Sequence, residues 1–327
     1  MDRTAALMEQ APVPAAGLSV FDRSGMLFRH VRGIADLITG RAVTADDWWD
    51  LASLTKVLVT LPRVLSLCDA GRLDLDRPLG EQWDRAAGSP VGAASVRQLL
   101  AHNGGVRPIV EFFRFAQGRD AIVDAALATP LDRPPGGAAA YSDLGYLLLG
   151  ELVRELEVPI PSPGLRYAPL PGPAVATEQC RWRGRLISGE VHDENAWAMG
   201  GQSGHAGAFG TLDLVTAAAR AWLADEVVSP ALHEQARQQW AGNSHGERFG
   251  LGWWLNPTRD VAGPSAGPHS YGATGFVGNR VWFEPDRGYG VVLLSNRVHP
   301  VRDGDLGPFR AWTHRLFAAI ADETRQH

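Results

Sequence analysis

A serine and a lysine stand three residues apart in the segment Ser53-Leu54-Thr55-Lys56. If this segment is helical, the Ser53 hydroxyl and the Lys56 amine lie on one face of the helix and can touch. A serine hydroxyl is a poor nucleophile at neutral pH and needs a base, and an amine can be that base if burial or a neighbouring charge lowers its pKa. The pair therefore predicts a serine nucleophile, Ser53, activated by Lys56.

Lys56 is the only lysine in a chain that contains 31 lysine and arginine residues together. Arginine can supply surface charge, but a guanidinium cannot replace an amine that must sometimes be neutral. On average composition, a serine stands three residues before a given lysine in about one case in 15. An N-capping serine beside a solvated lysine is therefore the less favoured interpretation.

A second polar group, Tyr141-Ser142-Asp143, follows a Pro/Gly-rich loop and precedes an apolar helical stretch. At such a loop-to-helix junction, the Tyr141 phenol could relay a proton between the nucleophile and the leaving group. Asp143 could hold Lys56 or bind a substrate amide. The structural alternative makes Asp143 a helix cap and Tyr141 a packing residue.

A third group, Tyr271-Gly272-Ala273-Thr274-Gly275-Phe276, leads into a predicted strand. Small residues leave the backbone of a sheet edge open to a ligand. An amide near Phe276, paired with the Ser53 N–H, could then stabilise the oxyanion of a tetrahedral intermediate. A plain glycine-rich turn is the alternative.

The elements that must position these groups come from both chain ends. The pattern predicts a β-hairpin over residues 18–34 and a helix over 52–70 that Pro62 kinks and Gly71 ends. It predicts further helices over residues 95–101, 119–128, 141–156, 211–224, 229–240 and 306–321, and strands over 251–255, 275–283 and 289–295. We therefore expect an α+β fold in which an antiparallel sheet is built from both chain ends and flanked by helices. Residues 1–65 and 245–327 would form the sheet-containing region and residues 66–244 an inserted, mostly helical region, with the active site between them.

The composition limits which classes of partner and substrate we expect. The net charge of −5 and the lack of an arginine-dense stripe argue against a nucleic-acid partner. No segment resembles a signal peptide or a membrane span, so we expect a cytoplasmic protein, or a periplasmic or secreted one if a leader has been removed. A small-molecule ester, amide or peptide is the expected substrate. The oligomeric state stays open.

Histidines and carboxylates gather at His192-Asp193-Glu194 and His205. Their spacing is neither His-Glu-x-x-His nor a cysteine pattern, so we expect no metal and no cofactor. The segment Gly201-Gln202-Ser203-Gly204-His205 lacks the last glycine of Gly-x-Ser-x-Gly, which counts against an α/β-hydrolase elbow.

Taken in this order and spacing, the three groups resemble the serine β-lactamase and penicillin-binding protein superfamily, particularly its class C, D-alanyl-D-alanine carboxypeptidase and esterase-like branches. Ser53-Leu54-Thr55-Lys56 looks like the first motif of that family, Tyr141-Ser142-Asp143 like its Tyr-x-Asn motif, and Ala273-Thr274-Gly275 like its Lys-Thr-Gly or His-Thr-Gly motif. The resemblance covers nearly the whole chain. Supporting matches are the segments 96–105, 191–196 and 204–207.

The resemblance implies a serine hydrolase that acts through an acyl-enzyme on an ester or amide. Two departures bear on the substrate: Asp143 stands where asparagine is commonest, and Ala273 replaces the basic residue that helps bind a substrate carboxylate in the family. D-Alanyl-D-alanine carboxypeptidase or β-lactamase activity is one alternative. A catalytically silent sensor or binding module, which Ala273 favours and the retained Ser53, Lys56 and Tyr141 oppose, is the other.

Overall fold

One nine-stranded antiparallel sheet dominates the computed structural model, which describes residues 1–162, 164–256 and 261–325. Its strand order is β3-β2-β1-β14-β13-β12-β11-β10-β9. The strands are β1 (Ala15–Asp22), β2 (Met26–Asp36), β3 (Arg41–Ala42), β9 (Ala241–Gly242), β10 (Arg248–Phe249), β11 (Trp254–Leu255), β12 (Tyr271–Thr274), β13 (Arg280–Glu284) and β14 (Tyr289–Ser295). Because β1 pairs with β14, strands from the two chain ends form one sheet, and the predicted α+β fold is confirmed.

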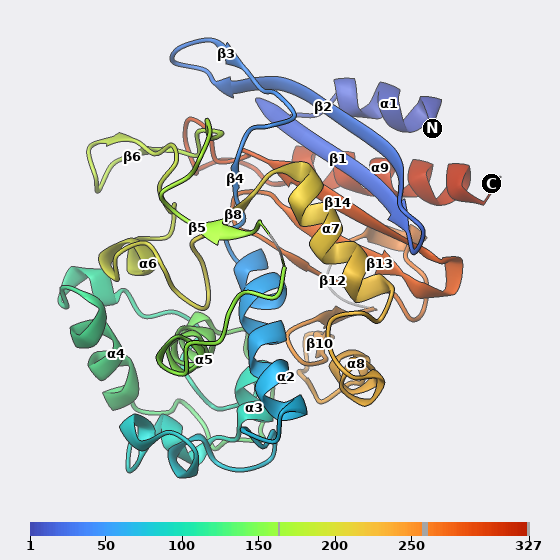
Figure 1. Cartoon of the computed structure of the whole chain (residues 1–327). Helices are drawn as coiled ribbons and strands as arrows, with labels where there is room; N and C mark the ends of the chain where they lie inside the picture. Colours follow the sequence, from blue (N-terminus) through green and yellow to red (C-terminus); the bar gives the residue numbers. More distant parts are fainter. Residues whose placement is uncertain (163, 257–260, 326–327) are drawn as a thin grey trace.

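Both faces of the central strands are covered, which explains why β14 is buried along its whole length. Helices α1 (Asp2–Glu9) and α9 (Gly307–Thr324) pack together on one face, where Trp312 and Leu316 meet Leu18 and Leu293 in one apolar cluster. Helix α7 (Leu212–Leu223) packs on β1 and β14 from the other face (Figure 1). Burial on both sides makes these strands a rigid base for the site.

The remaining helices form a second group beside the sheet (Figure 1). They are α2 (Leu61–Asp69), α3 (Val96–Leu100), α4 (Arg119–Ala128), α5 (Asp143–Glu155), α6 (Glu194–Ala198) and α8 (Pro230–Arg237). A small sheet joins β4 (Trp49–Asp50) and β5 (Arg166–Tyr167) to β8 (Ala208–Gly210), and β6 (Gln179–Cys180) pairs with β7 (Arg185–Leu186). The division into two regions stays a prediction. Within the described residues, every helix is too short or too polar to cross a bilayer.

The helix that carries Lys56 is irregular at its start. Residues Lys56–Thr60 form a π-helical turn, and the Leu61 N–H bonds to the Lys56 carbonyl, five residues back. Pro62 follows at the beginning of α2 and has no N–H to donate, so the regular ladder cannot run through this point. The expected kink at Pro62 is thus a widened turn, and it contains the lysine.

Two expectations about strands need correction, and one helix was not predicted. Residues 275–279 form a turn between β12 and β13 rather than the beginning of a strand, because the Gly275 N–H bonds back to the Asn279 carbonyl. In the apolar run 251–255, only Trp254–Leu255 is a strand, since residues 250–253 form a turn closed by the bond from the Gly250 N–H to the Trp253 carbonyl. Helix α1 was not expected at all.

Candidate active site

Ser53 stands at the beginning of the helical segment that continues into α2, at a point where the backbone is strained. The preceding residue, Ala52, has a φ of +46°, in the left-handed region that non-glycine residues rarely adopt. Asp50 holds this conformation, because its Oδ1 accepts a 2.7 Å hydrogen bond from the Ala52 N–H. The Asp50 Oδ2 accepts from the His192 N–H at 2.6 Å, so one buried carboxylate ties two segments of the site together.

The Lys56 amine is buried beside Ser53 and surrounded by acceptors. Its Nζ donates to the Ser53 Oγ at 2.9 Å and to the His205 carbonyl at 3.2 Å. The Asp143 Oδ1 lies 2.7 Å from the same Nζ. Because an ammonium has three protons to donate, these three partners satisfy it. The structure therefore brings together Ser53, Lys56 and Asp143, which lie far apart in the sequence except for the first pair.

The charge state of Lys56 differs from the one that sequence reasoning required. Burial disfavours the ammonium, but the Asp143 carboxylate and the Tyr141 phenol outweigh it and hold the pKa of Lys56 above its ordinary value. Lys56 is thus a cation in the resting site. The lysine can accept the proton of Ser53 only if it gives one of its own protons away at the same time.

Tyr141 lies against the lysine and is fixed by aromatic neighbours. The Lys56 Nζ is 5.0 Å from the centroid of the Tyr141 ring. That ring stacks on Trp254 of β11 at 5.5 Å and lies 4.5 Å from the His102 ring. Tyr141 is therefore a packing residue and also a neighbour of the lysine. Ser142 occupies the N-cap position of α5 without a capping side-chain hydrogen bond, and the Asp143 side chain pairs with Lys56.

The end of β12 meets the segment that leads into Ser53. A Cβ at Gly275 would lie 2.8 Å from the Leu51 carbonyl oxygen, so only glycine fits this close approach. Phe276 follows in the turn. Among the described residues, neither the Ser53 N–H nor the Phe276 N–H has a hydrogen-bond acceptor. Two free amides beside the nucleophile are the donors that an oxyanion needs, and their convergence on one oxygen stays a prediction.

A loop far along the chain completes the lysine's surroundings. Gly150 of α5 and Gly204 are in such close contact that a Cβ on Gly150 would lie 2.2 Å from the Gly204 Cα. The Thr60 hydroxyl donates to the Gly204 carbonyl at 2.8 Å. These contacts press the loop against the lysine helix and bring the His205 carbonyl to Lys56.

The sequence profile of the Beta-lactamase family matches residues 2–314. The chain belongs to the beta-lactamase family. Among its relatives, a protein of Escherichia coli O157:H7 named as a D-alanyl-D-alanine carboxypeptidase is 28% identical, over 94% of this chain and 84% of that protein. The N-acetylmuramyl-L-alanine amidase of Bacillus subtilis (strain 168) is also 28% identical, over 80% of this chain and 70% of its own length. The crystal structure of SurE with D-Leu superposes with a TM-score of 0.71 at 26% identity, covering 99% of this chain and 75% of that one.

In this beta-lactamase-family chain, the third motif supplies no charge from its first position. The Ala273 side chain is 4% exposed and belongs to the main apolar core. His269 does not replace the missing base at this position, because it is exposed and lies 2.9 Å from the Asp286 carboxylate. Thr274 is partly exposed at the end of β12 and lines a cavity with Gly275 and Phe276.

Two buried histidines support the site, although sequence reasoning gave them no role. His205, whose carbonyl accepts from Lys56, also joins the Ser203 Oγ at 2.8 Å and the Asp193 Oδ1 at 2.9 Å. Burial opposes the charge of Asp193, but His205 outweighs it and holds the pKa of Asp193 well below its ordinary value. Both histidines lie in segments included in the family resemblance.

Among the described residues, no cluster of three histidine, cysteine or carboxylate side chains is arranged to hold a metal ion.

His102 is the second of these histidines. Its burial should make the free energy of unfolding depend on pH. Burial, with a smaller contribution from Lys56, lowers the pKa of His102 from 6.5 to about 3. The neutral ring accepts from the Ser142 N–H at Nδ1. Below pH 6.5 the unfolded chain takes up a proton that the folded chain refuses, so stability falls as the pH drops from 6.5 towards 3, by up to about 1.4 kcal/mol per pH unit from this group.

The variant His102→Asn should remove this part of the slope. Asparagine tolerates the φ of +60° at this position, and its carbonyl oxygen can accept from the Ser142 N–H. Urea unfolding at pH 7, 6, 5 and 4 measures the effect, with the exposed His245→Asn as the matched control. Equal slopes for wild type and His102→Asn would contradict the assignment.

Proposed function

We propose that this chain is a serine hydrolase that forms an acyl-enzyme on Ser53 with an ester or amide substrate. One observation carries the proposal: the only lysine of the chain is buried with its Nζ 2.9 Å from the Ser53 Oγ and 2.7 Å from the Asp143 carboxylate. Burying the charged amine of Lys56 costs free energy unless the amine is paired. Activation of a serine nucleophile gives a buried amine at this position a function.

The proposed chemistry follows from the charge of Lys56. Ser53 Oγ attacks the carbonyl carbon and gives its proton to Lys56, while Lys56 passes a proton to the Asp143 carboxylate. The Ser53 and Phe276 amides hold the oxyanion. The proton then returns through Tyr141 to the leaving group, and the bond between the acyl carbon and the leaving group breaks. Water hydrolyses the acyl ester and restores the Ser53 hydroxyl.

Burst kinetics with p-nitrophenyl acetate test this proposal directly. We expect one equivalent of p-nitrophenol per chain in the first phase, followed by slower turnover. Intact mass spectrometry of a quenched sample should show one added acetyl group, and peptide mapping should place it on Ser53. No burst and no adduct, or an adduct only elsewhere, would overturn the proposal.

Peptidase action is a second candidate, because the Escherichia coli O157:H7 relative is named as a D-alanyl-D-alanine carboxypeptidase. It predicts release of D-alanine from a peptide ending in D-alanyl-D-alanine and a penicilloyl adduct on Ser53. Unmodified protein after prolonged exposure to penicillin would count against it. A protein that forms the adduct but turns over no ester or peptide would instead be a silent binding module.

A further inference from the structure

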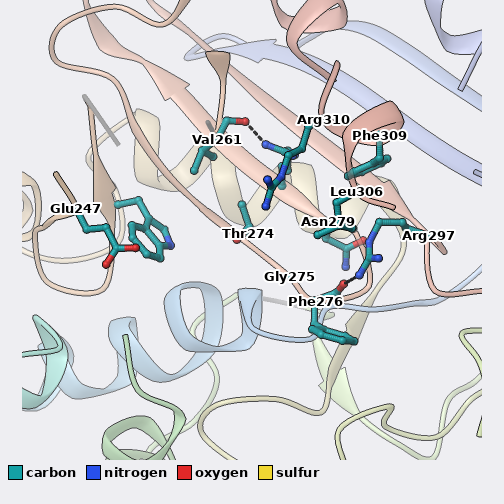
Figure 2. Close-up of a pocket in the computed structure, with 13 residues that line it drawn as sticks. Glu247, Val261, Thr274, Gly275, Phe276, Asn279, Arg297, Leu306, Phe309 and Arg310 are labelled. Atoms are coloured by element: carbon teal, nitrogen blue, oxygen red, sulfur yellow. Dashed lines mark hydrogen bonds between the residues drawn. The ribbon is translucent and has the colours of Figure 1, made fainter. Parts of the chain in front are cut away.

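The Phe276 N–H, a proposed oxyanion donor, lies in the short turn that joins β12 to β13. The turn lines a cavity of about 640 Å³ through Gly275, Phe276 and Asn279 (Figure 2). It is closed by backbone bonds from the Gly275 N–H to the Asn279 carbonyl at 2.8 Å and from the Gly278 N–H to the Gly275 carbonyl at 2.9 Å. The Phe276 side chain is 52% exposed, so burial alone does not fix this residue.

Three side chains from other segments hold this exposed phenylalanine. The His192 ring stacks on the Phe276 ring, with the two centroids 5.6 Å apart and the planes at 23°. The guanidinium carbons of Arg297 and Arg302 lie 5.6 and 5.9 Å from the same centroid, within reach of a cation–π contact. The Arg297 Nη2 also donates to the Phe276 carbonyl at 2.6 Å (Figure 2). The ring and the carbonyl of Phe276 are thus both held, whereas its N–H has no acceptor among the described residues.

His192 is itself fixed at two points. Its N–H donates to the Asp50 Oδ2 at 2.6 Å, and its ring Nε2 lies 2.7 Å from the Glu178 Oε2. Glu178 also pairs with Arg302. Burial opposes the charge of Glu178, but His192 and Arg302 outweigh it and lower the pKa of Glu178 to about 2. The imidazole and one of the guanidinium groups that contact the Phe276 ring are therefore anchored to the same buried carboxylate.

Asp50 connects this support to both segments that carry the proposed oxyanion donors. Its Oδ1 accepts from the Ala52 N–H, next to Ser53. Its backbone carbonyl accepts from the Asn279 Nδ2 at 2.8 Å, at the end of the turn that contains Phe276. The spacing between the two amides therefore depends on a connected group of buried hydrogen bonds rather than on the backbone of a single element.

We propose that His192 is a positioning residue that holds the Phe276 N–H where the oxyanion forms. This role rests on the proposed function and deepens it, because His192 acts through Phe276 rather than on the substrate. An amide donor stabilises the transition state only if it is already about 2.7–3.1 Å from the position of the oxyanion. A turn that is free to move would have to be ordered during the reaction, so the rate would fall. The loss should appear in kcat, since the donor acts more strongly on the oxyanion than on the carbonyl oxygen of the bound substrate.

Two esters that differ in one atom test this role: p-nitrophenyl acetate and its thiono analogue, which has C=S in place of C=O. With both, the Ser53 Oγ bonds to the attacked carbon and p-nitrophenolate leaves. A sulfur anion has a longer bond to carbon and accepts weaker hydrogen bonds, so amides placed for an oxygen should favour the oxygen ester. We expect the ratio of kcat/KM for the two esters to exceed the ratio of their hydroxide-catalysed hydrolysis rates by about tenfold or more.

Two variants of His192 separate the stacking contact from the pairing with Glu178. His192→Gln can still bond to Glu178 but has no ring. It should lower kcat for p-nitrophenyl acetate by about tenfold or more and bring the ester ratio close to the hydroxide value. His192→Phe keeps a ring against Phe276, while Glu178 keeps Arg302 as its partner, so it should retain most of the preference. Partial unfolding would lower both rates equally and leave the ratio unchanged.

His30→Gln is the matched control. His30 also stacks on a phenylalanine, Phe28, at 6.2 Å and lies 2.7 Å from a glutamate, Glu9, but these residues belong to β2 and α1. This variant should leave the ester ratio unchanged. A wild-type ratio equal to the hydroxide value, an unchanged ratio in His192→Gln, or equal losses in His192→Gln and His192→Phe would overturn the positioning role while Ser53 still becomes acylated. If mass spectrometry finds neither an acetyl nor a thioacetyl group on Ser53, the proposed function itself fails.

Discussion

Replacing Ser53 by alanine is expected to lower kcat/KM for p-nitrophenyl acetate by about 10⁴-fold or more, the scale on which loss of a nucleophile acts in serine enzymes. Ser53 is the only serine, threonine or cysteine among the described hydrogen-bond and ion-pair partners of the Lys56 Nζ, because the others are the His205 carbonyl and the Asp143 carboxylate. Folding should survive, since Ser53 is only partly buried. Initial rates, with intact mass after acetylation, check the result.

Ser203 offers the matched control for this substitution. The Ser203 Oγ is hydrogen-bonded to the His205 ring, which in turn contacts the Asp193 carboxylate, so Ser203 also stands beside a histidine–carboxylate pair. However, Ser203 is 5% exposed, and the imidazole contacts it from only two residues away, as expected of a structural hydrogen bond. Ser203→Ala should change kcat/KM less than about tenfold. A large loss of kcat/KM in Ser203→Ala, with activity kept in Ser53→Ala, would show that Ser203 and not Ser53 is the nucleophile.

The parts of the fold that sequence predicted are those whose pattern is local. The alternation in β1 and β2, around the turn at residues 22–25, and the helical spacing in α4 and α7 each lie within one element. The short strands β9, β10 and β11 have two residues each, too few for any period to be visible. The apolar residues at 275–279 resemble a strand, but the Gly275 N–H bonds to the Asn279 carbonyl, and the backbone of Gly275 lies against Leu51, which is distant in the sequence.

The candidate site also has a part that the sequence predicts and a part that depends on tertiary folding. Ser53 and Lys56 meet because helical spacing alone brings them together, so their contact followed from the sequence. The charge of Lys56 did not, because it depends on Asp143, which tertiary folding brings within 2.7 Å. Likewise, no pattern could show that the His205 carbonyl reaches Lys56, because the close contact of Gly150 with Gly204 that brings this loop there forms only in the folded chain.

Replacing Lys56 by arginine is expected to lower kcat/KM by about 10³-fold or more, although the positive charge is kept. The introduced guanidinium could still pair with Asp143, so the buried charge would remain balanced and the fold intact. A guanidinium does not release a proton at neutral pH, so it cannot take part in the exchange that moves a proton from Ser53 to Asp143. The loss should therefore appear in the rate of acylation, measured as the burst phase with p-nitrophenyl acetate.

Arg63→Lys, in the same helical segment, is the matched control for Lys56→Arg. It is buried in α2, and its guanidinium donates to the Val158 and Val153 carbonyls at 2.7 and 3.3 Å. Arg63→Lys should cost about 1 kcal/mol in the free energy of unfolding, because the lysine cannot reproduce both hydrogen bonds, with little effect on the burst rate. If Lys56→Arg instead acylates within tenfold of the wild type, proton exchange through Lys56 is not required. The role of the lysine would then be reduced to holding Asp143 and the His205 loop around the nucleophile.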